Sequence, residues 1–254
     1  MQILELWQFP IKGFGGSQVG TAKLTTDGYF PNDRYFAVSN GGQKIASARS
    51  GAWFPKAHFL QLMSHEGLAE YNCQYLTDGT EPVLELFHHG QSCISINPDS
   101  DHDQRQFEDF ISCNFGNYLH GQPRLMQMKD RAYSDQSTPL ISIASHASLD
   151  IFADATGTAP SNCRFRINII IGAVRGFAEN DMIGQTFRCG KAQIEVQKAV
   201  GRCAAINVDP KTARRSDKDF VRLMKKKFGH SDLGVFAKVI KGGKIKVGDV
   251  MLPI

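Results

Sequence analysis

One cysteine, Cys203, directly follows Arg202 between a strand-like stretch and an Asp-Pro turn at residues 209–210. A cysteine acts as a nucleophile or metal ligand through its thiolate, and a neighbouring cation favours that charged form. The turn is expected to hold the sulfur at the end of a strand, within reach of a ligand. Free cysteines are also among the most often buried residues, so the local residues alone favour a packing role.

Further basic and small polar residues stand where predicted strands meet turns. Glycine lets backbone N–H groups approach an anion closely, and Lys and Arg bind phosphate through their charge. Arg166 lies at the start of the most apolar strand, so a partly buried guanidinium there needs an anionic partner. Any other arginine of the set, taken alone, fits a solvated strand end better. The candidates for an anion site are Lys12, Gly13, Arg34, Arg49, Ser142, Arg166 and Asn168.

Two other clusters have simpler interpretations. The basic run at 225–227 lies among apolar residues at helical spacing, which favours the solvated face of an amphipathic helix over a nucleic-acid patch. Ser216, three residues before Asp219, is predicted to begin that helix. His88 and His89 have no partner at helical i,i+4 spacing and no paired cysteine, which favours an exposed loop pair over a metal site.

Composition and length describe an ordinary globular chain. The 254 residues are 42% hydrophobic and 21% charged, with a net charge of +4, enough for one large β domain or two smaller ones. The six cysteines form no CxxC pair, which argues against structural zinc and iron–sulfur clusters. Neither a secretory leader nor a run of roughly 18 apolar residues is present. A cytoplasmic protein without a membrane or nucleic-acid partner is therefore predicted.

Most of the chain is predicted to form short strands separated by glycine. Residues 35–39 are predicted to pair with 44–48 across a turn at 40–42. Residues 129–138 show no strong periodicity and are interpreted as a linker within the site-bearing region. The other predicted strands cover residues 3–9, 83–87, 93–96, 167–172, 186–189, 192–200, 235–240 and 244–252.

Two further helices are expected. One begins within residues 97–103 and buries aromatic residues at helical spacing up to Phe115. The other runs from a Ser145 cap to about residue 155 and is closed by Gly157. Many strands, few helices and no βαβ alternation predict a β-rich α+β protein with a barrel-like sheet, rather than a Rossmann fold.

Five segments stand out in chain order: 9–13 (FPIKG), 33–36 (DRYF), 164–169 (RFRINI), 201–203 (GRC) with 208–210 (VDP), and 234–250. In these segments, and in their order, the chain resembles the MOSC family, which is named after the C-terminal domain of molybdenum cofactor sulfurases. The similarity is strongest to the branch with an N-terminal MOSC β-barrel domain, which includes the amidoxime-reducing components and their bacterial relatives. It implies an MOSC-type β-barrel with an N-terminal β-barrel-like subdomain, divided into residues 1–125 and 126–254.

The resemblance also implies roles for individual residues. It makes Cys203 the catalytic residue and the thiolate ligand of molybdenum in the Mo-molybdopterin cofactor. Gly201 and Arg202 are expected beside the pterin, and Asp209 is expected to be a nearby acid. Many relatives have a second cysteine at the position of Val200 and a proline at that of Ile167, although neither change removes a proposed ligand. The residues expected to hold the pterin and its phosphate are Lys12, Gly13, Arg34, Arg49, Ser142, Arg166 and Asn168.

The function implied by the resemblance is that of a molybdenum-cofactor oxidoreductase that reduces N-hydroxylated small molecules. No clustered cysteines of a ferredoxin domain follow the barrel, so electrons are expected from a separate flavin or iron–sulfur reductase. One alternative is a non-catalytic carrier of molybdenum cofactor, or of sulfur on Cys203. Another is a barrel that has lost the cofactor and serves as a binding module.

Overall fold

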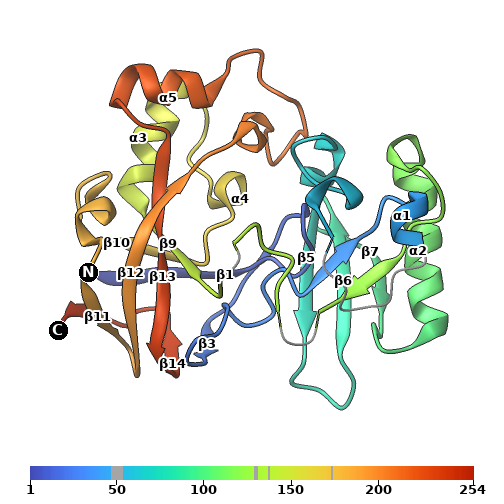
Figure 1. Cartoon of the computed structure of the whole chain (residues 1–254), viewed down its shortest axis with the longest axis horizontal. Coiled ribbons are helices and arrows are strands. Elements are labelled where there is room, and N and C mark those ends of the chain that lie inside the picture. Colours follow the sequence, from blue (N-terminus) through green and yellow to red (C-terminus); the bar gives the residue numbers. More distant parts are fainter. Residues whose placement is uncertain (47–53, 129–130, 137, 173) are drawn as a thin grey trace.

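The computed structural model describes all residues except 47–53, 129–130, 137 and 173. Figure 1 shows a large curled sheet with the helices α3 and α5 against it, beside a second region built on a smaller sheet and the helix α2. Among the described residues, no helix combines the length and apolar character that a membrane span requires. The predicted β-rich α+β class is confirmed.

The large sheet has the strand order β15-β11-β12-β13-β9-β10-β1-β2. Its neighbouring strands are antiparallel except for β9 and β10, which are parallel. A parallel pair needs a crossover, which α3 provides. The strands are β1 (Gln2–Gln8), β2 (Ser17–Gln18), β9 (Ile141–Ser145), β10 (Ile169–Gly172), β11 (Thr186–Cys189), β12 (Ala192–Gly201), β13 (Asp232–Lys241) and β15 (Met251–Pro253).

The two ends of this sheet meet. Gln2 forms an antiparallel bridge with Val250, and the backbone N–H of Met251 donates to the carbonyl of Met1 at 2.8 Å. These contacts curl the sheet into a barrel. Its interior is filled by alternating apolar side chains, such as Ile194 and Val196 of β12, which are fully buried.

Helices α3 (His146–Thr156) and α5 (Phe220–Phe228) pack together on the outside of the sheet. As predicted, the Ser145 hydroxyl caps α3 by accepting from the Ser148 N–H, and Gly157 ends it in the left-handed conformation. The predicted start of α5 at Ser216 is wrong. Asp219 caps this helix instead, because its carboxylate accepts from the Arg222 N–H, whereas Ser216 is engaged in the preceding turn.

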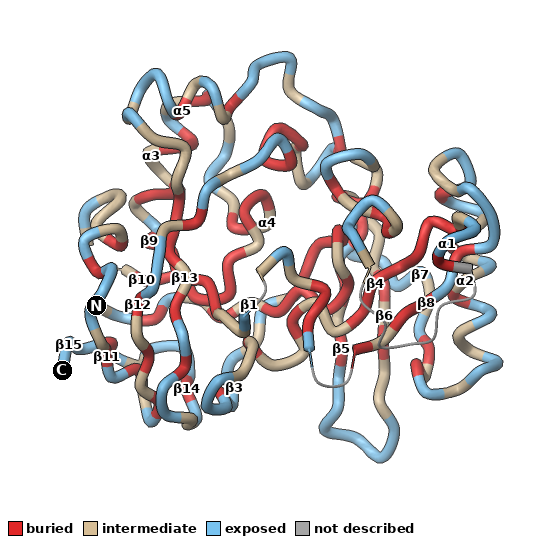
Figure 2. The backbone as a smooth tube through the Cα atoms, viewed as in Figure 1, coloured by how far each residue is buried: buried red, intermediate tan, exposed pale blue. Residues whose placement is uncertain are grey.

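Single turns complete the barrel region. They are α4 (Asn162–Phe165), η4 (Ala178–Met182) and η5 (Ala204–Asn207). Although α4 has only one turn, Asn162, Arg164 and Phe165 in it are buried, and it is red in Figure 2.

The second region is an antiparallel meander of β5 (Tyr71–Leu76), β6 (Val83–His88) and β7 (Gln91–Ile96). Helix α2 (Asp101–Phe115) is capped by Ser100 and buries Phe107, Ile111 and Phe115 in the core of this region. This pattern confirms the helix predicted from the apolar spacing. The short turns η1 (Lys56–His58), η2 (Glu66–Glu70) and η3 (Gly116–Tyr118) complete the region.

The predicted hairpin of residues 35–39 with 44–48 is wrong. Strand β4 (Phe36–Val38) pairs with β8 (Leu125–Gln127), and residues 43–46 form the short helix α1 (Gln43–Ala46). The backbone of Asn40 explains the difference, because it exchanges hydrogen bonds with His58 and His120 and so leads the chain toward distant partners. Residues 47 and 48 lie outside the described residues.

The strand predicted at residues 244–252 is two strands. The chain turns at Gly248 (φ +91°), which separates β14 (Gly243–Lys246) from β15. β14 pairs with β3 (Thr21–Leu24), a strand that the sequence pattern did not indicate. The division into residues 1–125 and 126–254 remains a prediction. β1 and β3 pair with strands from the C-terminal half of the chain.

Candidate functional site

A cavity of about 330 Å³ is lined by segments from both regions of the molecule. The turns that follow β1 and precede β4 contribute to it, as do the loop before β9, the α4–β10 junction and the end of β12. The predicted site residues that line it are Lys12, Gly13, Arg34, Ser142, Arg166, Asn168, Gly201, Arg202 and Cys203. Asp209 is not among the lining residues, and Arg49 lies outside the described residues.

Arg166 reaches the cavity through a tight turn at the end of α4. Its backbone has a left-handed conformation (φ +55°), an unusual geometry for a side chain of this size. The Asn162 amide stabilises this turn by bonding both backbone groups of Ile167, at 2.8 and 2.9 Å. No described residue accepts a hydrogen bond from the Arg166 guanidinium. Burial lowers the pKa of Arg166 to about 10, and the nearby charge of Arg34 acts in the same direction.

Arg202 lies beside Arg166 and is fixed by the backbone. Its guanidinium donates to the carbonyls of Phe165 at 3.0 Å and Leu233 at 2.9 Å, and it lies over the Phe165 ring. Burial lowers the pKa of Arg202 to about 9; the sulfur of Cys203 opposes this shift, while Arg166 reinforces it. Two partly desolvated guanidiniums side by side form an electrostatically unfavourable arrangement that an anion would relieve.

Cys203 occupies the gap between the last residue of β12 and the first residue of η5. Cys203 is exposed and lines the cavity, unlike Cys73 and Cys189, which are buried in the cores. Burial raises the pKa of both core thiols, to about 12 for Cys189. The packing role that the local residues favoured for Cys203 is therefore wrong, because β12 ends before the cysteine and leaves it at the cavity.

Lys12 forms the opposite side of the cavity with a residue that the sequence did not single out. Its ammonium lies 2.8 Å from Asp135 Oδ1 and 2.9 Å from the carbonyl of Tyr133. Burial lowers the pKa of Lys12, and Asp135 opposes that shift. Burial by itself raises the pKa of Asp135, but nearby cations led by Lys12 outweigh it and the net shift is downward. The only sequence signal was the position of Asp135 within the linker of the site-bearing region.

Asp209 has a structural position. Its Oδ2 lies 3.0 Å from the buried guanidinium of Arg164, which also donates to the carbonyls of Ile206 and Val208 at 2.8 and 2.7 Å. Its Oδ1 accepts from the N–H groups of residues 211 and 212. Arg164 and Asp209 thus fix the segment that follows Cys203.

Ser142 and Asn168 hold β9 and β10 together at the edge of the cavity. The Asn168 Oδ1 accepts from both the backbone N–H and the hydroxyl of Ser142, at 3.0 and 2.8 Å. The Ser142 hydroxyl in turn accepts from the Asn168 N–H at 3.0 Å. These polar groups satisfy one another and fix the chain two residues after Arg166 against β9.

A second hollow of about 550 Å³ adjoins the cavity and shares Lys12, Tyr133 and Asp135 with it. Its aromatic lining includes Phe54 and Phe59. The hydroxyl of Tyr133 is buried and has no hydrogen-bond partner among the described residues. Burial raises the pKa of Tyr133 to about 12, so this hydroxyl keeps its proton. The sequence analysis did not identify this hollow.

Comparison with known proteins assigns the sequence to a family. The model of the MOSC N-terminal beta barrel domain matches residues 1–88, and that of the MOSC domain matches residues 129–252. The chain belongs to the MOSC family. Membership confirms the resemblance seen in the sequence and associates the chain with the molybdenum cofactor.

Individual relatives are distant. The chain is 25% identical over 245 residues to mouse mitochondrial amidoxime-reducing component 1, a match that covers 88% of this chain and 70% of the relative. Among solved structures, the YUAD protein from Bacillus subtilis is 13% identical, with 98% and 93% of the two chains covered and a TM-score of 0.46. YiiM from Escherichia coli is 18% identical, and the match covers 45% of this chain and 53% of the YiiM chain, with a TM-score of 0.35. Both TM-scores are below 0.5, so the family assignment rests on the sequence matches.

Proposed function

We propose that this MOSC protein is a molybdenum-cofactor oxidoreductase that reduces N-hydroxylated compounds with electrons from a separate partner protein. The observation that carries the proposal is the placement of an accessible thiol, Cys203, beside the guanidiniums of Arg166 and Arg202 in one cavity. The similarity to an amidoxime-reducing component supports the choice of reaction.

The residues of the cavity fit the chemical groups of the cofactor. A thiolate is a soft ligand suited to a metal, whereas phosphate requires hard cationic donors. Cys203 supplies the first, and Arg166, without an acceptor among the described residues, supplies the second. In this proposal Cys203 ligates molybdenum, and the pterin and its phosphate are held by Lys12, Arg34, Arg166 and Arg202, with Gly13 and Gly201 allowing close approach.

The remaining cavity residues position these groups. Arg34 donates to the backbone carbonyl of Arg166 at 3.1 Å, which helps to hold its unusual turn, while Ser142 and Asn168 join the strands on which the turn rests. Asp135 forms an ion pair with the Lys12 ammonium when no other anion is bound beside this lysine. Its side chain is 63% exposed, so it can move away when phosphate takes its place.

The cofactor, when bound, supplies the two-electron chemistry that an unassisted protein side chain cannot provide. Reduction of an N-hydroxyl group breaks the N–O bond, consumes two electrons and two protons, and releases water. The adjoining aromatic hollow is proposed to bind the organic part of the substrate. There, Asp135 can contact a polar nitrogen group.

The test is to purify the protein from a molybdenum-replete host and to measure molybdenum, pterin and reduction of an N-hydroxylated amidine with an artificial electron donor. The proposal predicts stoichiometric metal and turnover in the wild type. Protein that carries the cofactor but reduces no N-hydroxylated compound would contradict the enzymatic assignment.

The accessibility of Cys203 also favours a second function, a non-catalytic carrier of cofactor or of sulfur on this thiol. A carrier must release what it holds. Intact-mass measurement for a persulfide on Cys203 and the rate at which bound pterin passes to a cofactor-free acceptor distinguish the two functions. Slow release together with turnover favours the enzyme, whereas rapid release without turnover favours the carrier.

A further inference from the structure

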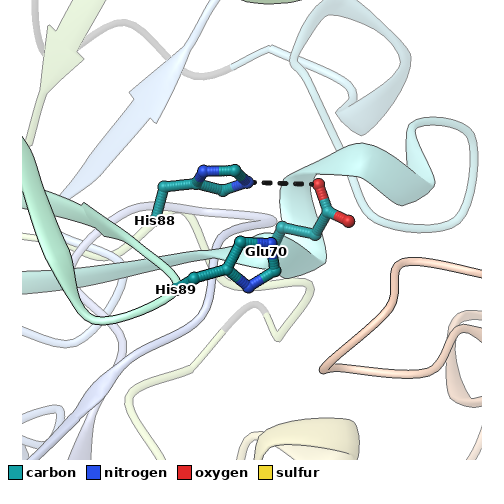
Figure 3. Close-up of side chains that lie close together, drawn as sticks. All are labelled: Glu70, His88 and His89. Carbon is teal, nitrogen blue, oxygen red and sulfur yellow. Dashed lines mark hydrogen bonds and ion pairs between the residues drawn. The ribbon is translucent and has the colours of Figure 1, made fainter.

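Three side chains away from the cavity place potential metal ligands close together. They are Glu70 at the end of η2 and His88 and His89 at the end of β6. Their ligand atoms all lie within 4.8 Å of one another. None of the three lines the cavity. Figure 3 shows both imidazoles extending toward the Glu70 carboxylate.

The β6–β7 turn explains how consecutive histidines come together. Successive side chains of a regular strand point to opposite faces of the sheet. Here His89 (φ +48°) and Gly90 (φ +81°) form the turn between the paired residues His88 and Gln91, and positive φ at both central positions is typical of a tight hairpin. The turn brings the two ring centroids to within 4.2 Å.

The neighbouring strand fixes the other half of the cluster. Tyr71 pairs with His88 across the β5–β6 ladder, and its ring stacks on the imidazole at 4.7 Å and 24°. Glu70 directly precedes Tyr71, so its carboxylate lies beside the same ring, with Oε2 3.4 Å from His88 Nε2. One face of the His88 ring is thus packed, and its Nε2 is directed at the carboxylate.

We propose that Glu70, His88 and His89 bind a single Zn²⁺ or a similar borderline divalent cation. Imidazole nitrogen and carboxylate oxygen are preferred Zn²⁺ ligands at about 2.1 Å, which places tetrahedral neighbours about 3.4 Å apart. The His88–Glu70 separation of 3.4 Å already has this value. His89 is exposed and can rotate into place, and water can fill the fourth position. The prediction of a simple exposed loop pair omitted Glu70, which is 18 residues away in sequence.

The chain offers a matched control. His146 and Asp150 of α3 form an exposed histidine–carboxylate pair at 3.0 Å, with side chains 46% and 47% exposed. Among the described residues, no further histidine, cysteine or carboxylate completes a metal cluster there. His146→Ala therefore removes an imidazole and an ion pair without removing a proposed ligand.

The experiment is calorimetric titration of ZnCl₂ into untagged, chelator-treated protein. The proposal predicts one saturable equivalent that is lost, or weakened about tenfold or more, in His89→Ala and in Glu70→Gln, and is retained in His146→Ala. His89→Ala spares the packed His88 ring, and Glu70→Gln preserves side-chain volume, so circular dichroism is expected to show both variants folded. Absence of a saturable equivalent in the wild type, or equal binding in His89→Ala and wild type, would overturn the proposal.

Discussion

The two sides of the cavity are built differently. The barrel wall, which consists of Arg164, Arg166, Asn168 and Arg202, is held by contacts with backbone carbonyls and by interlocked polar groups from β9 and β10. In the facing wall, which consists of Lys12, Tyr133 and Asp135, the Lys12 ammonium donates to the Tyr133 carbonyl and also forms an ion pair with Asp135, whose carboxylate is largely exposed.

This difference separates fixed from exchangeable interactions. Hydrogen bonds to backbone carbonyls set the positions of the Arg164 and Arg202 guanidiniums before any ligand arrives, so their alignment costs little at binding. The Lys12–Asp135 pair is solvated on one side and can be exchanged for another anion. We infer that the barrel wall defines the cofactor site and that the facing wall adapts to what binds there.

The largest effect on stability is expected from Arg164→Met. The change leaves the carbonyls of Ile206 and Val208 without their buried donor and the Oδ2 atom of Asp209 without its ion-pair partner. It should lower the free energy of unfolding by about 2–3 kcal/mol. Denaturant titration measures this, with Arg175→Met as the control, because the Arg175–Asp181 pair is 73% and 67% exposed and should contribute less than about 0.5 kcal/mol. Equal effects of the two variants would contradict the fixed barrel wall.

A smaller loss is expected from Asn168→Ala. It removes the acceptor for the Ser142 N–H and hydroxyl inside the sheet, at a cost of about 1–2 kcal/mol. Chemical unfolding and amide exchange of β9 report this loss. If β9 keeps wild-type protection, the polar link between the strands is not what holds this wall.

The smallest change in stability is expected on the facing wall. Asp135→Asn should alter the free energy of unfolding by less than about 1 kcal/mol. It removes the carboxylate that competes for Lys12, so cofactor-free protein should bind pyrophosphate roughly fivefold more tightly, equivalent to about 1 kcal/mol. Calorimetry tests this against Asp181→Asn, which removes an exposed carboxylate that does not line the cavity. Unchanged or weaker pyrophosphate binding in Asp135→Asn would show that Asp135 does not compete for this site.

Local periodicity and capping predicted two of the helices, α2 and α3, although the same reasoning placed the start of α5 at Ser216 instead of Asp219. The apolar spacing up to Phe115 and the cap from Ser145 to Gly157 identified α2 and α3, because a helix is specified by residues three or four apart. Motifs in the family's order indicated the residues around Cys203 that the structure gathers in one cavity. Their roles toward a cofactor remain proposals.

Features that depend on distant partners could not be predicted. β4 pairs with β8, which lies about 90 positions away, although a glycine turn suggested a nearer partner. Asp135 and Glu70 gain significance only through Lys12 and His88, their neighbours in space. The local sequence does not predict contacts between residues that are far apart in the chain. A polar residue in an aperiodic stretch is also more often solvated than functional.

Cys203 is proposed to bind molybdenum at the edge of the barrel wall. The most direct measurement is molybdenum per mole of folded protein in Cys203→Ser, compared with wild type and with Cys113→Ser, which replaces an exposed cysteine of α2. A serine hydroxyl is a poor substitute for a soft thiolate. Cys203→Ser is therefore expected to lose the metal and the reduction of N-hydroxylated substrate, while Cys113→Ser keeps both. Molybdenum content and turnover in Cys203→Ser equal to those of a metal-containing wild type would show that Cys203 is not the ligand.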